Sequence, residues 1–214
     1  MRFVLAVAAA VSVMAVGCTP AGTPSTSTTS TTSTTSTTTS SSVPSSSTVD
    51  AQFLSAGGTW AAGVRDCGGD SYEFAQTFVP QRSGIIDRVS VAAQPRDRPS
   101  GLSIRIVEAD GAFGAPSGTQ LGRGSYEGSG VVTPTEVVDV ALRVPAPVQV
   151  GVRYALVFST YTGLCPPPGS WRLGGNTSAS DLYTAGELWS QTRPYTSWRR
   201  SGSSSDLFFR IWIR

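Results

Sequence analysis

Two residue types on which enzymes often rely are missing from this 214-residue chain, which has no histidine and no lysine. Without histidine there is no Ser-His-Asp or Cys-His arrangement, no His-ligated zinc and no imidazole acid or base. Without lysine there is no Schiff base and no Ser-Lys dyad. The absences predict a protein that is not an enzyme and that carries neither a cofactor nor a catalytic metal.

Carboxylates are the acids that remain, and a glycoside hydrolase needs only two of them about 5 to 9 Å apart. The 14 acidic residues are scattered singly along the chain, where solvation or turn capping is their usual role. A carboxylate-dependent glycoside hydrolase is therefore the less favoured alternative. The Gly-rich segment 122–125 lacks the lysine of a phosphate-binding loop and any following helical pattern, which argues against a nucleotide site.

Charge is also close to balanced. All 16 basic residues are arginine, and the formal net charge is +2. Loss of Arg2 with an N-terminal leader would bring the chain nearer to neutrality. Net charge therefore gives no reason to expect a nucleic-acid partner.

The N-terminus has the pattern of a signal peptide. Arg2 precedes a small, apolar run over residues 3–16, which is too short for a stable membrane span and ends at Thr19-Pro20. The run closes on Ala15-Val16-Gly17-Cys18, which resembles the lipobox of bacterial lipoproteins, although Leu is usual where Ala15 stands. We expect residues 1–17 to be a signal peptide and Cys18 to carry acyl chains that anchor the protein to the membrane. The alternative is ordinary cleavage and secretion.

Three cysteines are an odd count for an exported protein. If Cys18 takes lipid, Cys67 and Cys165 remain as a pair. In an oxidising compartment we expect a disulfide between them, which would stabilise the domain by about 4 to 5 kcal/mol in the chain-entropy model. The alternative is two buried free thiols.

Hydroxyl residues dominate the next segment. Between residues 19 and 49, 24 of 31 positions are Ser or Thr and none is charged. Such a segment cannot bury enough apolar surface to offset its ordering entropy. We therefore expect residues 18–49 to be a lipid-attachable cysteine followed by a disordered Ser/Thr-rich stalk.

Residues 50–214 are enough for one domain with a sizeable core. Short alternating runs broken by Gly, Pro, Ser and Asp predict an all-β, antiparallel β-sandwich. The expected strands are 72–78, 85–93, 102–108, 122–126, 136–142, 148–150, 154–159, 171–173 and 207–213. In the last of these, alternation places Leu207, Phe209, Ile211 and Ile213 inward and Phe208, Arg210, Trp212 and Arg214 outward.

Several of these segments resemble, in order, the strands of a family of exported bacterial sandwich modules. The matching segments are 75–78 (AQTF), 85–91 (IIDRVSV), 110–116 with Leu121, 151–157 (GVRYALV) and 206–210 (DLFFR). They are similar to modules of the choice-of-anchor type, in which a jelly-roll-like domain is joined to varied surface anchors. The resemblance implies the fold, and it transfers no ligand and no catalytic residues.

Aromatic residues are concentrated late in the chain, in a Gly/Ser-rich stretch expected to be mostly loop. Flat rings there would stack on sugar faces, and Asp181, Asn176, Gln191 and Arg193 would supply hydrogen bonds. The candidate ligand-binding residues are Trp171, Asp181, Tyr183, Trp189, Tyr195 and Trp198. The alternative is that these rings are core or cover the sheet.

Together these features predict a non-catalytic binding module of the cell envelope. It would be held outside the cytoplasm by acylated Cys18 and would bind carbohydrate, such as an envelope polysaccharide. The alternative from another class is a structural or protein-interaction domain that contacts another surface protein.

Overall fold

The computed structural model describes residues 46–65, 71–96, 101–160, 170–177, 181–192, 197–202 and 205–214. Cys18, Cys67 and Cys165 lie outside these ranges, so the expected acylation and disulfide stay predictions. Tyr195 and Arg193 also lie outside them.

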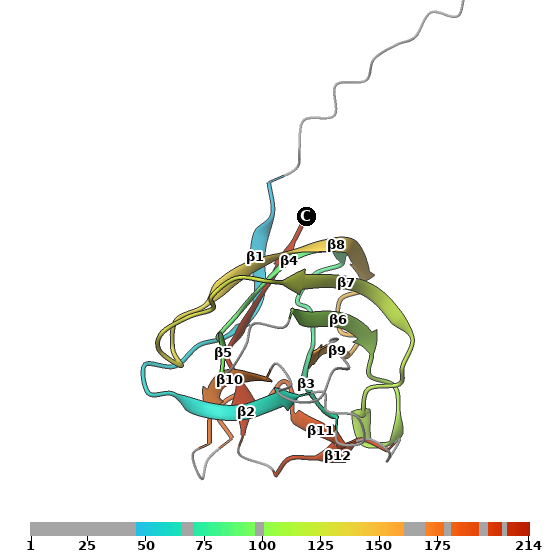
Figure 1. The fold of residues 1–214 in the computed structure, drawn as a ribbon. Helices are drawn as coiled ribbons and strands as arrows, with labels where there is room; N and C mark the ends of the chain where they lie inside the picture. Colours follow the sequence, from blue (N-terminus) through green and yellow to red (C-terminus); the bar gives the residue numbers. More distant parts are fainter. Residues whose placement is uncertain are drawn as a thin grey trace, which may run out of the picture. The chain divides into compact units, whose positions relative to one another are not determined.

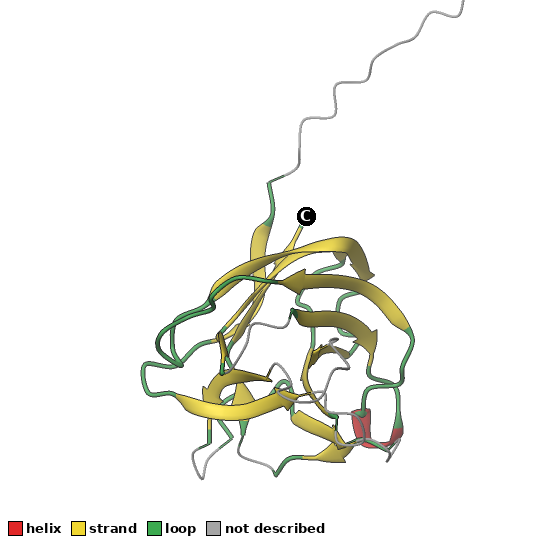
Figure 2. Ribbon diagram, viewed as in Figure 1, coloured by secondary structure: helices red, strands yellow, loops and turns green. Residues whose placement is uncertain are grey.

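The regular secondary structure of the described residues is almost entirely β-strand, joined by loops and turns (Figures 1 and 2). A 3-10 turn, η1 (Ala112–Gly114), follows β6, and no helix in the described ranges is long and apolar enough to cross a membrane. The strands are β1 (Thr48–Phe53), β2 (Thr59–Arg65), β3 (Tyr72–Phe78), β4 (Gly84–Val91), β5 (Ala93–Pro95), β6 (Leu102–Glu108), β7 (Gln120–Tyr126), β8 (Val138–Val148), β9 (Tyr154–Thr160), β10 (Ser170–Asn176), β11 (Leu188–Thr192), β12 (Arg199–Arg200), β13 (Asp206–Leu207) and β14 (Phe209–Ile213).

All the strand pairings among the described residues are antiparallel. They follow the order β1-β14-β4-β8-β7-β6-β9-β3-β2-β10-β13, with β11 paired to β3 and β12, and β5 paired to β10. The sheet curls so that two halves face each other, β1, β14, β4 and β8 on one side and β6, β9, β3, β2 and β10 on the other (Figure 1). The predicted all-β, antiparallel sandwich is confirmed.

The core lies between these halves and contains the residues that alternation places inward. Val89 and Ile211 from one half share a single apolar cluster with Ile104, Leu156 and Phe158 from the other. All five side chains are completely or almost completely buried. Burial of this apolar surface is the main force that closes the curled sheet.

Strand β8 differs from the prediction of two strands, 136–142 and 148–150. It runs without a break from Val138 to Val148 and includes Pro145 and Pro147. Its pairing with β7 ends at Val144, whereas pairing with β4 continues to Val148. The prolines therefore lie where β8 is paired on one side only, and a missing backbone N–H is tolerated there.

The predicted outward position of Phe208 is wrong. The chain breaks pairing at this residue, between β13 and β14, and the backbone N–H of Phe208 donates to the carbonyl of Gly174 at 2.9 Å. Its ring enters the core and is 1% exposed. Gly58 makes the space, since a Cβ at that position would overlap the Phe208 ring. Leu207, Phe209, Ile211 and Ile213 are buried as predicted.

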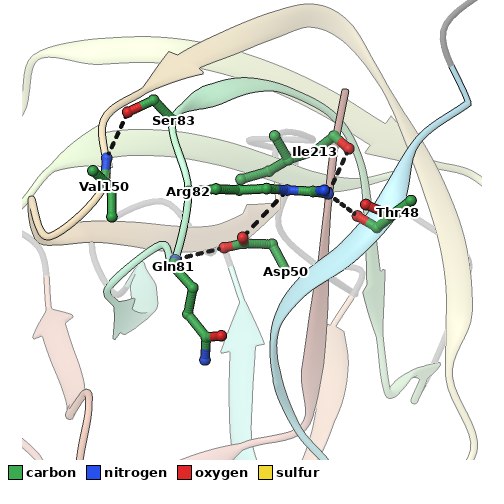
Figure 3. Close-up of polar contacts among 7 residues, drawn as sticks. All are labelled: Thr48, Asp50, Gln81, Arg82, Ser83, Val150 and Ile213. Atoms are coloured by element: carbon green, nitrogen blue, oxygen red, sulfur yellow. Dashed lines mark hydrogen bonds and ion pairs between the residues drawn. The ribbon is translucent and has the colours of Figure 1, made fainter.

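The first and last strands are joined by a polar network around Arg82 (Figure 3). The Arg82 guanidinium donates to the carbonyls of Thr48 on β1 and Ile213 on β14, both at 2.8 Å, and pairs with Asp50 at 3.4 Å. The other carboxylate oxygen of Asp50 accepts a bond from the backbone N–H of Gln81. The network fixes β1 at the edge of the sheet, where its backbone pairs only with β14.

Candidate functional site

A second, smaller apolar cluster lies on the outward side of β11, β3, β9 and β6. Because side chains alternate along a strand, the outward positions are those that do not enter the core. The cluster consists of Ala75, Val107, Ala109, Ala155, Val157 and Trp189, with Ala115 and Trp198 packed against it. All six residues of the cluster are almost completely buried, so it is a second small core and not an open apolar surface.

A cleft of about 240 Å³ opens on this outward face, between Trp198 and the loop that follows η1. The aliphatic side chains of Val107 and Val157 form an apolar part of its lining, and the half-buried ring of Trp198 lines it as well. The remaining lining residues are Glu73, Arg105, Pro116, Ser117, Gly118 and Gln191.

Polar groups in the cleft are held by the strand register. Gln191 on β11 lies directly opposite Glu73 on β3. The Arg105 guanidinium on β6 donates to the Glu73 carboxylate at 3.1 Å, and the two side chains are 30% and 10% exposed. The cleft thus combines an aromatic ring, an apolar surface and directed hydrogen-bonding groups, which is the usual composition of a small-ligand site.

Two of the predicted ligand-binding aromatics belong to the core. Trp171 on β10 is 0% exposed and contacts the edge of the Tyr126 ring at a centroid distance of 5.8 Å. Tyr183 packs against Phe53 and Phe209, and burial raises the pKa of its hydroxyl to about 12. Trp171 therefore offers no face for stacking, and the partly buried Tyr183 ring packs against the core.

The other two described aromatics come together on the outward face. Trp189 is 4% exposed, and its buried indole N–H finds no acceptor among the described residues. Trp198 packs against the same cluster but keeps part of its ring open to the cleft. Among the described members of the predicted set, Trp198 is the ring that lines the cleft.

The predicted polar partners separate in the same way. Asp181 is exposed and caps a turn, since its carboxylate accepts a bond from the backbone N–H of Tyr183 at 3.1 Å. Asn176 is 7% exposed and lies opposite Asp206 in the β10–β13 pair. Gln191 is the one that reaches the cleft.

Asp206 is a buried acid whose environment the sequence does not reveal. It is 2% exposed, and its carboxylate accepts a bond from the Gln76 amide at 3.0 Å, while Gln76 accepts one from the backbone N–H of Leu207. Burial, and in second place the charge of Asp181, raise the pKa of Asp206 to about 6. The group links β3 to β13 and is a structural element.

No protein-family model and no curated protein matches this sequence. Within the described ranges, no three His, Cys, Asp or Glu side chains gather closely enough to hold a metal ion.

Sequence reasoning missed Glu73 and Arg105 as site residues. Each lies in a correctly predicted strand, at an outward position. The order β3-β9-β6 brings the two side chains together, although 31 residues separate them in the chain. The signal available in the sequence was the alternation of Ser103, Arg105 and Val107, which marks the outward side of β6.

Proposed function

We propose that this protein is a non-catalytic binding module of the bacterial cell envelope and that it binds carbohydrate in the cleft beside Trp198. The observation that carries the proposal is the half-buried Trp198 ring beside the polar groups of Gln191 and Arg105. An aromatic ring stacks on the apolar face of a sugar, and amide and guanidinium groups bond its hydroxyls. In this interpretation Glu73 holds Arg105 in place.

Presentation on the envelope is part of the proposal. Residues 1–17 act as the signal peptide, acylated Cys18 as the anchor and the Ser/Thr-rich segment as the tether, in the manner of the choice-of-anchor proteins. The arrangement of the domain supports this: β11 and β12 lie at the end opposite the beginning of β1 (Figure 1). A site beside these strands would lie far from the strand to which the tether is joined.

A structural or protein-interaction role is the second candidate, and one observation favours it. Phe113 in η1 is 94% exposed, and its backbone has a positive φ of 59°. An aromatic residue rarely adopts that backbone conformation. A protein partner that covers the ring would explain both the unusual conformation and the exposure of the side chain.

A carboxylate-dependent hydrolase is the third candidate. The cleft beside Trp198 contains Glu73 as an acid, and Glu73 is paired with Arg105. Glu73 is the one acid among the described residues that line this cleft, whereas a glycoside hydrolase needs two carboxylates, and for this reason we prefer a binding role.

Isothermal titration of envelope oligosaccharides into the mature chain, residues 18–214 with Cys18→Ala, tests the proposal. Trp198→Ala should reduce affinity by about 5-fold or more, because a stacked ring contributes about 1 kcal/mol or more. Trp212→Ala is the control, since Trp212 is also half-buried but lies on the outward side of β14 and stacks on Arg88. Unchanged affinity in the Trp198 variant, or no binding of any oligosaccharide, would refute the proposal.

A further inference from the structure

Three arginines lie side by side on the outward face, next to the cleft beside Trp198. Arg105 on β6 is directly opposite Arg123 on β7. Arg143 on β8 joins them in lining a neighbouring cleft of about 420 Å³. The other lining residues are Ser103, Gln120, Gly124 and Ser125. We call Arg105, Arg123 and Arg143 the arginine row.

A β-bulge lies next to Arg143 on β8. Arg123 pairs with Val144 and the next residue, Gly124, pairs with Leu142, so Arg143 is the extra residue between them. Alternation after the buried Leu142 already places Arg143 outward, and the bulge leaves Val144 on that side as well. Leu142 enters the core, whereas Arg143 and Val144 are both exposed.

Glycines on β7 allow strands β7 and β8 to lie close together. A Cβ at Gly124 would lie 2.8 Å from the carbonyl oxygen of Ala141, and one at Gly122 would lie 2.7 Å from the Ala146 Cβ. The Gly-Arg-Gly-Ser sequence therefore does not form a loop around a phosphate. It is a strand whose small residues face β8 and whose Arg123 faces outward.

Among the described residues, the charge of the arginine row is neutralised only in part. Like charges directly opposite each other on a sheet are destabilising, and Arg105 and Arg123 are such a pair. Glu73 pairs with Arg105, but in the described part of the chain no carboxylate pairs with Arg123 or Arg143. The lining of this second cleft contains no acid.

We infer that the carbohydrate bound by this protein is anionic and that its carboxylate or phosphate groups lie on the arginine row. This inference rests on the proposed function and specifies its ligand. Guanidinium groups bind both oxyanions through paired hydrogen bonds. The facing hydroxyls of Ser103 and Ser125 and the amide of Gln120 add neutral donors.

Arg105 connects the two clefts, because it lines both. A polymer that crosses β6 can therefore place one sugar ring on Trp198 and the charge of a neighbouring unit on Arg123 and Arg143. The two clefts together would bind a polymer whose repeating unit alternates a flat sugar ring with an anionic group.

The test compares three probes at low and high salt by isothermal titration: oligogalacturonate for the carboxylate, a glycerol-phosphate oligomer for the phosphate, and an uncharged galacto-oligosaccharide of matched length. One anionic probe should bind at least about 10-fold more tightly than the uncharged one, and salt should reduce the difference. The double variant Arg123→Gln, Arg143→Gln should lower the affinity for that anionic probe by about 10- to 100-fold and leave the affinity for the uncharged probe unchanged.

Arg88→Gln with Arg214→Gln is the matched control, since it removes the same charge from β4 and the C-terminus, where each arginine pairs with an acid. If all probes bind equally and the row variant changes nothing, the inference is overturned while binding that depends on Trp198 stands. If the row variant binds the anionic probe more weakly and Trp198→Ala changes no affinity, stacking on Trp198 is refuted and anion binding on the arginine row is supported. A single-stranded DNA oligomer that binds as tightly as the anionic saccharides would overturn the assignment to carbohydrate.

Discussion

Glu73 and Arg105 form an ion pair across β9, the strand that lies between β3 and β6. The pair stands at the junction of the two clefts, and Glu73 neutralises the one member of the arginine row that lines both. Arg123 and Arg143 are farther along the sheet, on β7 and β8. The carboxylate therefore holds one guanidinium in place and leaves the positive potential of the other two intact.

Replacement of Glu73 by Gln should tighten the binding of the anionic oligosaccharide severalfold at low salt, because a negative charge next to the ligand is removed while the side-chain shape is kept. The uncharged oligosaccharide should bind as before. Titration of both probes against the variant measures this, with Glu136→Gln, in an exposed loop, as the control for net charge. Weaker binding of the anion would show that the position in which Glu73 holds Arg105 matters more to the ligand than the repulsion from the Glu73 charge.

The tryptophans should divide into structural and functional residues. Trp171→Ala should lower the free energy of unfolding by about 3 to 5 kcal/mol, because a large ring in the core is replaced by a cavity. Trp198→Ala should lower the free energy of unfolding much less, since the Trp198 ring is only half-buried. Urea denaturation of both variants measures the difference. Equal losses would mean that Trp198 is as much a core residue as Trp171.

The sequence predicted the individual strands better than it predicted the site. The strands at 72–78 and 102–108 have the expected bounds because alternation and flanking turn residues coincide there. It missed β11, where Leu188 and Trp189 are both buried because each covers a different face of the sheet. Alternation cannot reveal such a strand.

The arginine row could not be predicted for a different reason. Its three members come from three strands that are neighbours in the sheet, β6, β7 and β8. The register between strands does not follow from residue patterning. Among the predicted aromatics, Trp171 lies in the core and Trp198 lies beside the cleft, and spacing alone does not distinguish a ring in the core from one in a loop.

The network around Arg82 should contribute to stability by fixing the first strand (Figure 3). Arg82→Ala removes two hydrogen bonds and leaves the Asp50 side chain, which is 2% exposed, without its cation. An unfolding free energy lower by about 1 to 3 kcal/mol is expected, because a buried acceptor loses a partner. Thermal or urea unfolding measures this loss of stability. Asp50→Asn should lower the free energy of unfolding less in the Arg82→Ala variant than in the parent protein.

The anchor is tested separately from the domain. Cys18→Ala should release the full-length protein from the membrane fraction into the medium, because the acyl chains that hold it there cannot be attached. Immunoblots of the two fractions measure the distribution. Retention equal to that of the parent protein would contradict lipidation at Cys18.

Stability should fall as the pH rises from about 4 to above 6, and Asp206 is the expected cause. Its pKa is raised by burial from 3.8 to about 6, so between these values the folded state binds a proton that the unfolded state has released. The contribution is present below pH 4 and is lost as the pH passes 6, and it amounts to about 1 to 3 kcal/mol. Asp206→Asn keeps an acceptor for Gln76 but does not titrate. Urea unfolding between pH 4 and pH 7 should therefore change less in the variant than in the parent, and parallel profiles would assign the pH dependence to another group.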